Sequence, residues 1–547
     1  MVEKILANLK IRLEEIVKEL GVTDTVEIFF ETPKEEKYGD YSTNIAMRIA
    51  RYLRKNPMLI ANEIVQKIDL HQYHLTKCEV AGGGFINFFL DREYIANIIF
   101  EILKLKDNFG KLEIGKGKNV NIEFVSANPT GYLHIGHGRG AAYGDSLARI
   151  MTKAGFNVTR EYYVNDAGNQ INNLVESIYE RYKELFGLEI LMGEDYYYGE
   201  EIIEIAKKIK EEYGDYYLNN PYKQDFRKFG VNYLLKGLKE DLELFNVTFD
   251  IWFSEQSLYD SGAVQETINY LIEHGYTYEK DGAIWLKTTL YDDEKDRVLV
   301  KSDKTLTYLA PDIAYHRNKL ERGYDYLINV FGADHHGYVK RLKAAIAFVG
   351  GNPDLLDVEI LQMVRAIQNG EEVKMSKRSG KAISLRDLID EVGTDALRFM
   401  YISKALSSPM DLDLDLAVKN TNENPVYYVQ YAYARISSLF RVVEEQGIQY
   451  KEATEFKNVD LSKLNNLILT LTKYPSIIEE AATKRLPHKI VQYLIELASN
   501  LHSYYNDEKI ITNNIDEVNE KLTILKAVQI VLKDGLSLIG VGVKEKM

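Results

Sequence analysis

Apolar residues recur every three or four positions through the first twenty residues of the chain, and this spacing predicts an amphipathic helix. An apolar run from Val26 to Phe30 predicts a strand after it. A second helix is expected from Ile45. Three glycines at 82–84 predict a turn before a further strand that ends at Leu90. The first 110 residues therefore have the pattern of a small α/β module.

The most informative stretch runs from a strand through a turn into a helix. Apolar and polar residues alternate from Val120 to Phe124, which predicts the strand. Asn128–Gly131 has turn chemistry, and the Ala-, Gly- and Leu-rich run after His134 predicts a helix to Ile150. The first amides of a helix are unpaired and its dipole favours an anion, so this arrangement predicts a phosphate site.

Two histidines and a glycine begin that helix. His134 and His137 are three positions apart, so both face the same side of its first turn. Gly136 has no side chain, which lets a flat ring or a phosphate approach the backbone. A polar turn after the next predicted strand contains Asn165, Asp166, Asn169 and Gln170. These four side chains either line a site for a ribose or an RNA end, or cap the turn.

The remaining segments are mostly helical in pattern. Residues 174–246 are acidic and rich in tyrosine, which predicts helices inserted into a nucleotide-binding fold. Residues 421–547 show no strand alternation and predict an all-helical bundle. Between them, Asp395 and Arg398 lie one turn apart near the start of a predicted helix, and we expect an ion pair between them.

The chain has 547 residues, too many for a single hydrophobic core, so we expect three or four domains. Hydrophobic residues make up 46% and charged residues 27%, the composition of an ordinary soluble globular protein. No apolar run approaches the length of a bilayer span, and the charged N-terminal helix differs from a signal peptide. We therefore expect a cytoplasmic protein without membrane contact.

Cys78 is the single cysteine, which excludes an intrachain disulfide and any multi-cysteine zinc site.

The net charge of −14 is unexpected for a partner of nucleic acid, but the charge is unevenly distributed. Residues 176–255 contain 18 acidic and 10 basic residues, a net of −8, and we expect this segment to face away from any RNA. Residues 374–386 contain five basic residues and no acidic one. An acidic protein can still present a basic track to RNA, although a uniformly solvated acidic surface is the alternative interpretation.

Two motifs and several longer strings resemble a known enzyme family. H-I-G-H at 134–137 and K-M-S-K at 374–377 match the two signatures of the class I aminoacyl-tRNA synthetases. The strings at 123–139 and 161–170 resemble the arginyl-tRNA synthetases in particular. The resemblance covers nearly the whole chain. Tyr433 stands where the family usually has histidine, and K-M-S-K is complete where many arginyl enzymes have a degenerate version.

The resemblance implies a mixed α/β fold, with a Rossmann-type parallel-sheet catalytic core with helical insertions, an N-terminal α/β add-on domain and a C-terminal all-helical bundle. The expected domains are a tRNA-contacting domain at 1–110, a catalytic domain at 111–420 with an insertion at about 174–246, and an anticodon-binding domain at 421–547. The implied reaction converts L-arginine and ATP to arginyl-adenylate and pyrophosphate, and then transfers arginine to the 3′ terminal adenosine of tRNA(Arg). ATP is expected to bind with Mg²⁺, no zinc is expected, and the implied state is a monomer.

The resemblance also assigns residues to each substrate. A guanidinium needs carboxylates and a flat aromatic wall, and lysines can neutralise the departing pyrophosphate. The implied arginine-binding residues are Glu123, Ser126, Asn128, Tyr308 and Asp312. The implied ATP-binding residues are His134, Gly136, His137, His335, Met375 and Ser376, and the implied catalytic residues are His134, His137, Lys374 and Lys377. The implied tRNA contacts are Tyr41, Asn44, Tyr427, Tyr431 and Arg435.

A metal site at His335 and His336 is the less favoured interpretation, because adjacent side chains point apart and Asp334 is the only other obvious ligand. Three other functions stay open. A small-molecule nucleotidylyltransferase also uses an H-x-G-H turn, but it would not need the helical C-terminal region. Another class I synthetase would fit the carboxylates of Glu123 and Asp312 poorly. An inactive tRNA-binding paralogue would be expected to lose motif residues, all of which are present.

Overall fold

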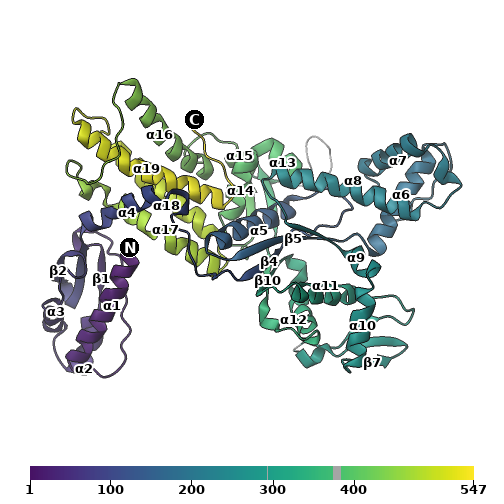
Figure 1. Ribbon diagram of the computed structural model, residues 1–547, viewed down its shortest axis with the longest axis horizontal. Helices are drawn as coiled ribbons and strands as arrows, with labels where there is room; N and C mark the ends of the chain where they lie inside the picture. The colour runs from purple at the N-terminus through teal and green to yellow at the C-terminus, as the bar shows by residue number, and fades with distance from the viewer. Residues whose placement is uncertain (292, 374–382) are drawn as a thin grey trace.

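The computed structural model describes the backbone of residues 1–291, 293–373 and 383–547, and the side chains at 36 and 334–336 also lie outside the described part (Figure 1). The N-terminal part contains a three-stranded antiparallel sheet in the order β1-β3-β2. Its elements are α1 (Val2–Glu19), β1 (Tyr41–Thr43), α2 (Ile45–Leu53), α3 (Pro57–Val65), β2 (Leu75–Ala81) and β3 (Phe85–Leu90).

The predicted N-terminal helix is present, and its apolar face is buried. The strand predicted from Val26 to Phe30 is wrong. Only Glu31 pairs with the sheet, through two backbone hydrogen bonds to Ser42 on β1. Because β1 has three residues, its free edge is too short to continue the ladder back to Val26.

The central sheet has five parallel strands in the order β11-β10-β4-β5-β6, the Rossmann-type core expected from the sequence. Its strands and the helices beside it are β4 (Asn119–Glu123), α5 (Ile135–Lys153), β5 (Asn157–Val164), β6 (Ile251–Ser254), α11 (Leu309–Glu321), β10 (Tyr326–Gly332), α12 (Val339–Phe348) and β11 (Leu356–Leu361). The first of these strands, β4, lies between β5 and β10, so the strand order reverses there. Ligands of open α/β sheets bind beyond the carboxyl ends of strands at such a point.

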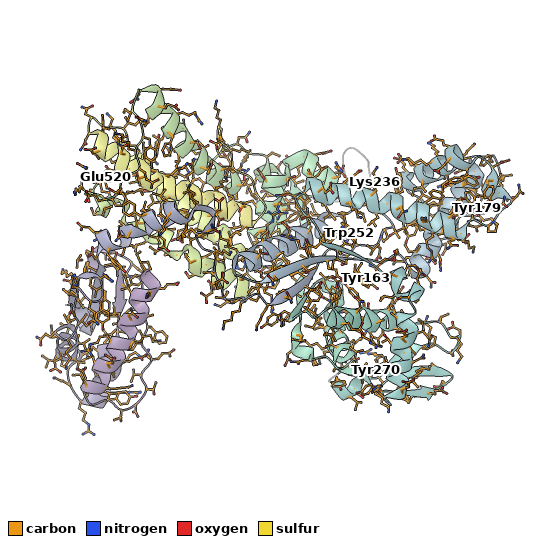
Figure 2. All side chains as sticks on the ribbon, in the orientation of Figure 1. Tyr163, Tyr179, Lys236, Trp252, Tyr270 and Glu520 are labelled. Atoms are coloured by element: carbon orange, nitrogen blue, oxygen red, sulfur yellow. The ribbon has the colours of Figure 1, made fainter. Side chains whose placement is uncertain are left out.

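Between β5 and β6 the chain leaves the sheet in three long helices, which project away from the rest of the molecule (Figure 1). They are α6 (Gly168–Glu184), α7 (Glu200–Tyr213) and α8 (Lys223–Leu244). Figure 2 labels Tyr179 and Lys236 on this projection. The rings of Tyr179 and Tyr222 stack with centroids 3.6 Å apart, next to the fully buried Phe226. The projecting helices therefore have an aromatic core of their own.

Two smaller sheets flank the central one. The first, in the order β7-β8-β9, packs with its neighbouring helices against α11 and α12. The strands of this sheet and the helices next to them are α9 (Glu255–Asp260), α10 (Ala263–Glu273), β7 (Thr277–Lys280), β8 (Ala283–Leu286) and β9 (Arg297–Val300). The second, in the order β13-β12-β14, contains β12 (Val364–Gln368), β13 (Glu371–Glu372) and β14 (Met410–Asp413).

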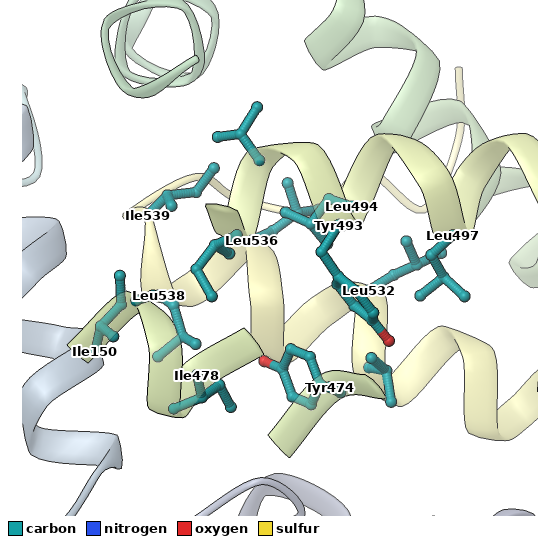
Figure 3. Close-up of a cluster of buried hydrophobic side chains, with 14 of the residues drawn as sticks. Ile150, Tyr474, Ile478, Tyr493, Leu494, Leu497, Leu532, Leu536, Leu538 and Ile539 are labelled. Carbon is teal, nitrogen blue, oxygen red and sulfur yellow. The ribbon is translucent and has the colours of Figure 1, made fainter. Parts of the chain in front are cut away.

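The C-terminal part is helical, as expected. It contains α13 (Leu385–Val392), α14 (Thr394–Ile402), α15 (Leu414–Ala417), α16 (Pro425–Glu445), α17 (Asn465–Thr483), α18 (His488–Asp507) and α19 (Ile515–Leu538). The helix α4 (Arg92–Leu105) packs on α17 and α19 and so joins the N-terminal sheet to this bundle. Figure 3 shows Ile478 of α17 and Leu538 of α19 close to Ile150 of α5. In the described part, no helix is both long and apolar enough to span a membrane.

The ion pair predicted between Asp395 and Arg398 is wrong. Arg398 Nη2 instead donates to Asp145 Oδ2 on α5 at 2.6 Å, and both side chains are fully buried. Asp395 accepts from the backbone N–H of Gly542 at 3.0 Å and from Gln430 Nε2 at 2.8 Å. Helical spacing offers a local partner, but an arginine buried among distant elements pairs with the carboxylate that is buried beside it.

A stability prediction concerns Gly144 of α5, which faces Phe124, the residue after β4. A methyl group at Gly144 would lie 2.2 Å from the buried Phe124 ring. We therefore expect Gly144→Ala to lower the free energy of unfolding by about 1–3 kcal/mol. Gly140→Ala in the same helix is the matched control, because its methyl group would meet only Leu361, at 3.7 Å. Chemical denaturation measures both variants, and equal stabilities would contradict the prediction.

Candidate active site

One cavity of about 780 Å³ lies at the carboxyl edge of the central sheet, next to the ends of β4 and β10. Eight of the residues that the resemblance assigns to arginine or ATP line it, and they come from the end of β4, the turn after it, the start of α5 and the start of α11. They are Glu123, Ser126, Asn128, His134, Gly136, His137, Tyr308 and Asp312. The structure thus brings all five residues predicted for arginine and three of the six predicted for ATP into one cavity, and their individual roles stay predictions.

A strained turn follows β4. Val125 and Ser126 have φ of +69° and +41°, in the left-handed region that a β-branched residue rarely adopts. Each such residue costs on the order of 1–3 kcal/mol, so neighbouring groups must hold it. Ser126 Oγ accepts from the backbone N–H of Tyr163 at 3.1 Å, and Asn165 Nδ2 donates to the Ser126 carbonyl at 3.2 Å. The turn brings Ser126 and Asn128 to the cavity wall.

The first residues of α5 exchange hydrogen bonds at the cavity. His134 Nδ1 accepts from the Gly136 N–H at 3.1 Å, and His137 Nδ1 accepts from the His134 N–H at 3.2 Å. Burial lowers the pKa of His134 and lowers the pKa of His137 to about 3, so both rings are neutral at pH 7. A neutral ring whose Nδ1 accepts carries its proton on Nε2, which can donate to an anion. With the N-terminal amides of α5, these donors suit this region to phosphate.

Another region of the cavity is acidic. Asp312 on α11 and Glu255 at the start of α9 both line the cavity, and the hydroxyl of Tyr338 donates to Asp312. Burial raises the pKa of Asp312 to about 7. Burial also raises the pKa of Glu255 to about 7, and repulsion from Asp312 adds to this shift. No lysine or arginine whose side chain is described pairs with either carboxyl. A bound cation would favour their ionised forms.

Glu123, at the end of β4, has a cationic partner. Lys319 Nζ donates to Glu123 Oε2 at 2.6 Å, and the lysine side chain is fully buried. Ser126 Oγ donates to the other carboxylate oxygen at 3.3 Å. Among the described side chains, the cavity therefore combines one paired carboxylate with two that lack a cation.

Glu255, Lys319 and Tyr163 are among the residues of this site that are absent from the sequence predictions. Glu255 comes directly after β6, so the rule that ligands lie beyond the carboxyl ends of parallel strands could have identified it. Lys319 follows Asp312 by seven positions, a spacing that places both on one face of a helix. Tyr163 lies among these carboxylates and is 6% exposed, but a buried tyrosine in a strand carries no local signal of function.

The polar turn after β5 has two kinds of residue. Asn165, Asn169 and Gln170 line the cavity. Gln170 Oε1 accepts from Asn128 Nδ2 at 2.6 Å. Asp166 instead accepts from the Ser254 hydroxyl at 2.6 Å and from the Gln256 N–H at 2.8 Å, so it caps the start of α9. Tyr308 lines the cavity with 76% of its surface exposed, which leaves its ring room to lie against a ligand.

The predicted tRNA contacts lie outside this cavity, in two places. Tyr41 on β1 and Asn44 before α2 belong to the N-terminal sheet region, and the side-chain oxygen of Asn44 is buried without a hydrogen-bond partner among the described residues. On α16, the rings of Tyr427 and Tyr431 stack with centroids 5.9 Å apart. The guanidinium of Arg435 lies 5.7 Å from the centroid of the Tyr431 ring. Such planar groups are able to stack on unpaired bases.

The second motif, Lys374, Met375, Ser376 and Lys377, lies outside the described residues, as does the side chain of His335. The described chain resumes at Ile383, next to the first motif. The N–H of Leu385 donates to the Leu133 carbonyl at 2.7 Å, and Ser384 forms a β-bridge with His134. The segment that follows the second motif is therefore joined to the start of α5.

Three family models match successive parts of the chain. The model described as "tRNA synthetases class I (R), catalytic domain" matches residues 99–408. The model "Arginyl tRNA synthetase N terminal domain" matches residues 7–90, and "DALR anticodon binding domain" matches residues 429–547. Together these matches extend over most of the chain.

Whole proteins with the same organisation are also similar to this chain. The arginine–tRNA ligase of Anoxybacillus flavithermus is 49% identical over 554 residues, with 100% of both chains covered. A crystal structure described as a putative arginyl-tRNA synthetase from Campylobacter jejuni is 35% identical with a TM-score of 0.77, and it covers 84% of this chain and 100% of its own. The Thermus thermophilus arginyl-tRNA synthetase, 23% identical, shares the fold with a TM-score of 0.72 over 99% of this chain and 100% of its own. This chain therefore belongs to the arginyl-tRNA synthetases, which are class I aminoacyl-tRNA synthetases.

Proposed function

We propose that this chain catalyses the two-step reaction of an arginine–tRNA ligase. In the first step, the α-carboxylate of L-arginine attacks the α-phosphorus of ATP, which forms arginyl-adenylate and expels pyrophosphate. In the second step, a hydroxyl of the 3′ terminal adenosine of tRNA(Arg) attacks the activated carbonyl, which forms arginyl-tRNA and AMP. Neither step needs a covalent enzyme intermediate, so positioning and electrostatics supply the catalysis.

One observation carries this proposal: a single cavity contains both a helix N-terminus with neutral histidines and two carboxyls that have a raised pKa and no described cationic partner. L-arginine and ATP have the complementary groups. The guanidinium is always protonated and forked, and ATP supplies the phosphates. Binding of the guanidinium would ionise Asp312 and Glu255 and compensate the charge that burial disfavours.

The two ends of arginine are assigned to different walls of the cavity. The guanidinium lies between Asp312 and Glu255, with the ring of Tyr308 against its face. The α-ammonium group lies at the β4 wall, which presents Glu123, Ser126 and Asn128. The α-carboxylate then faces the start of α5, where His134 and His137 bind phosphates and Gly136 lets adenosine approach.

The family resemblance assigns the residues of the second motif to the same site. Lys374 and Lys377 neutralise the charge that builds on the leaving pyrophosphate, and Met375, Ser376 and His335 contact ATP. Mg²⁺ accompanies ATP and is held mainly by phosphate oxygens and water. No zinc takes part in this proposal.

The tRNA is bound by the parts on either side of the catalytic region. Residues 1–110 contact tRNA(Arg) through Tyr41 and Asn44. Residues 421–547 bind the anticodon loop, and the contact residues are Tyr427, Tyr431 and Arg435. Residues 111–420, with the insertion at about 174–246, form the catalytic domain. The enzyme acts as a cytoplasmic monomer without membrane contact.

Pyrophosphate exchange into ATP, measured with each amino acid in turn, tests the reaction. We expect exchange with arginine alone, because among the amino acids only arginine has a forked cation that can pair with two carboxylates at once. Running the assay with and without tRNA(Arg) shows whether activation requires the tRNA. Exchange with a different amino acid, or none even with tRNA(Arg), would overturn the assignment of the cavity.

Asp312→Asn should weaken arginine binding selectively. The substitution removes a charge-assisted bond, so we expect the KM for arginine to rise roughly 10- to 100-fold. The KM for ATP should change by less than about threefold, since ATP binds at α5. Asp534→Asn is the matched control, because Asp534 is another half-buried carboxyl with a raised pKa that accepts a tyrosine hydroxyl, outside the cavity. An equal rise in both KM values would remove Asp312 from the arginine site.

Arginine affinity should depend on pH in a defined direction. The pKa of both Asp312 and Glu255 is raised to about 7, so each loses charge as the pH falls through this value. We expect arginine to bind more tightly as the pH rises from about 6 to about 8, while its guanidinium stays protonated. Calorimetric titration at several pH values measures this slope, and Glu255→Gln should make it shallower. A flat profile for the unmodified protein would contradict the assignment.

A further inference from the structure

Lys319 connects the two acidic regions of the cavity through buried hydrogen bonds. Its Nζ donates to Glu123 Oε2 at 2.6 Å and to Asn329 Oδ1 at 3.1 Å. Asn329 Nδ2 lies 3.2 Å from His316 Nε2, and His316 Nδ1 lies 2.8 Å from the Asp312 carbonyl oxygen. One series of hydrogen bonds thus runs from the end of β4 to the first turn of α11.

The direction of each hydrogen bond in this series follows from Lys319. An ammonium only donates, so Oδ1 of Asn329 accepts from it and the Asn329 amide donates to His316 Nε2. His316 then carries its proton on Nδ1 and donates to the Asp312 carbonyl. This neutral form is consistent with burial, which lowers the pKa of His316 to about 3. The Lys319 Nζ also lies 4.5 Å from the centroid of the Tyr315 ring, so the ammonium group makes a cation–π contact in addition to its two hydrogen bonds.

This series of hydrogen bonds makes the charge of the cavity asymmetric. Glu123 pairs directly with Lys319, whereas the described hydrogen-bond donor to the Asp312 carboxyl is the neutral hydroxyl of Tyr338, and Lys319 acts on Asp312 only through a weaker, longer-range attraction. In the part of the chain whose side chains are described, Glu255 also has no cationic partner. Among the described side chains, the carboxyls that lack a paired cation are therefore Asp312 and Glu255, and not Glu123 at the β4 wall. Arginine carries two cations, and this asymmetry distinguishes between them.

We propose that Lys319 is a positioning residue that sets the orientation of the amino-acid substrate. This inference rests on the proposed function and deepens it. Lys319 fixes the carboxylate of Glu123, so Glu123 accepts a hydrogen bond from the α-ammonium group. Because Lys319 also neutralises Glu123, the guanidinium is directed to Asp312 and Glu255.

Removal of Lys319 has a local consequence. Glu123 would become an unpaired buried carboxylate, which takes up a proton or turns toward other donors. In both cases it becomes a weaker or misplaced acceptor for the α-ammonium group. Lys319 forms no described ion pair with Asp312 or Glu255, and its attraction lowers the pKa of Asp312 by less than burial raises it, so the guanidinium keeps its site.

The experiment compares two ligands on the Lys319→Met enzyme, which replaces the ammonium with an apolar chain of similar length. L-arginine is measured by its KM in aminoacylation of tRNA(Arg). The second ligand is 5-guanidinopentanoate, which is arginine without the α-amino group, measured by its Ki as a competitor. We expect the arginine KM to rise about 10- to 100-fold and the Ki of the analogue to change by less than about threefold.

Arg322→Met is the matched control. Arg322 ends the same helix and forms a two-bond ion pair with the buried Glu161, at 2.7 and 2.9 Å, which does not line the cavity. It should lower stability without changing the ratio of arginine KM to analogue Ki. Asn329→Ala is a second variant in case Lys319→Met does not fold. It removes one acceptor of Lys319 without unpairing a charge, so the ratio should rise about 3- to 10-fold.

The outcomes are distinguishable. A selective rise in the arginine KM, absent in Arg322→Met, supports the positioning role. Equal weakening of both ligands in Lys319→Met, or an unchanged ratio in Asn329→Ala, overturns it and leaves Lys319 as a structural residue. If the unmodified enzyme neither charges tRNA(Arg) with arginine nor binds the analogue, the proposed function itself fails.

Discussion

The guanidinium of Arg398 holds four parts of the molecule together, and the position of α5 depends on it. Its Nε donates to the Ile539 carbonyl at 2.8 Å, its Nη1 to the carbonyls of Phe245 and Asn246 at 3.0 and 3.1 Å, and its Nη2 to Asp145. These acceptors lie after α19, after α8 and within α5. A cation buried this completely lowers stability unless its donors are satisfied, and losing one partner of a buried pair costs about 3–5 kcal/mol. Gly540 is required at the contact, because a Cβ there would lie 2.3 Å from the guanidinium.

Helix α5 transmits this constraint to the cavity. Its C-terminal half packs on the helical bundle (Figure 3), while its first turn carries the two histidines. The cavity itself is costly to form, since it contains two left-handed residues and two carboxyls whose ionised forms are disfavoured by burial. The rigid surroundings of α5 and β4 hold these groups in place before a ligand arrives. Binding energy is then not spent on arranging the site, which is the condition for electrostatic catalysis.

Local chemistry made much of this site predictable. The alternation that ends at Phe124, the turn and the helix after His134 are determined by neighbours within a few residues, and all are present. The failures involve partners that are distant in the chain. Arg398 pairs with a carboxylate 253 residues earlier, which helical spacing does not reveal. Extended residues from Val26 form no strand because the edge beside them is too short, a property of β1 and not of their own sequence.

The long range of the Arg398 contacts also has a kinetic consequence. The helices α6–α8 form their aromatic core from residues that are close in the sequence, so that projection is able to form early. The cluster around Arg398 must wait for loop closure over 253 residues to Asp145 and 141 residues to Ile539. During synthesis from the N-terminus, Ile539 is added 141 residues after Arg398. A nascent chain that already contains both histidines and both acidic residues of the cavity would therefore still have an incompletely satisfied Arg398 until Ile539 docks.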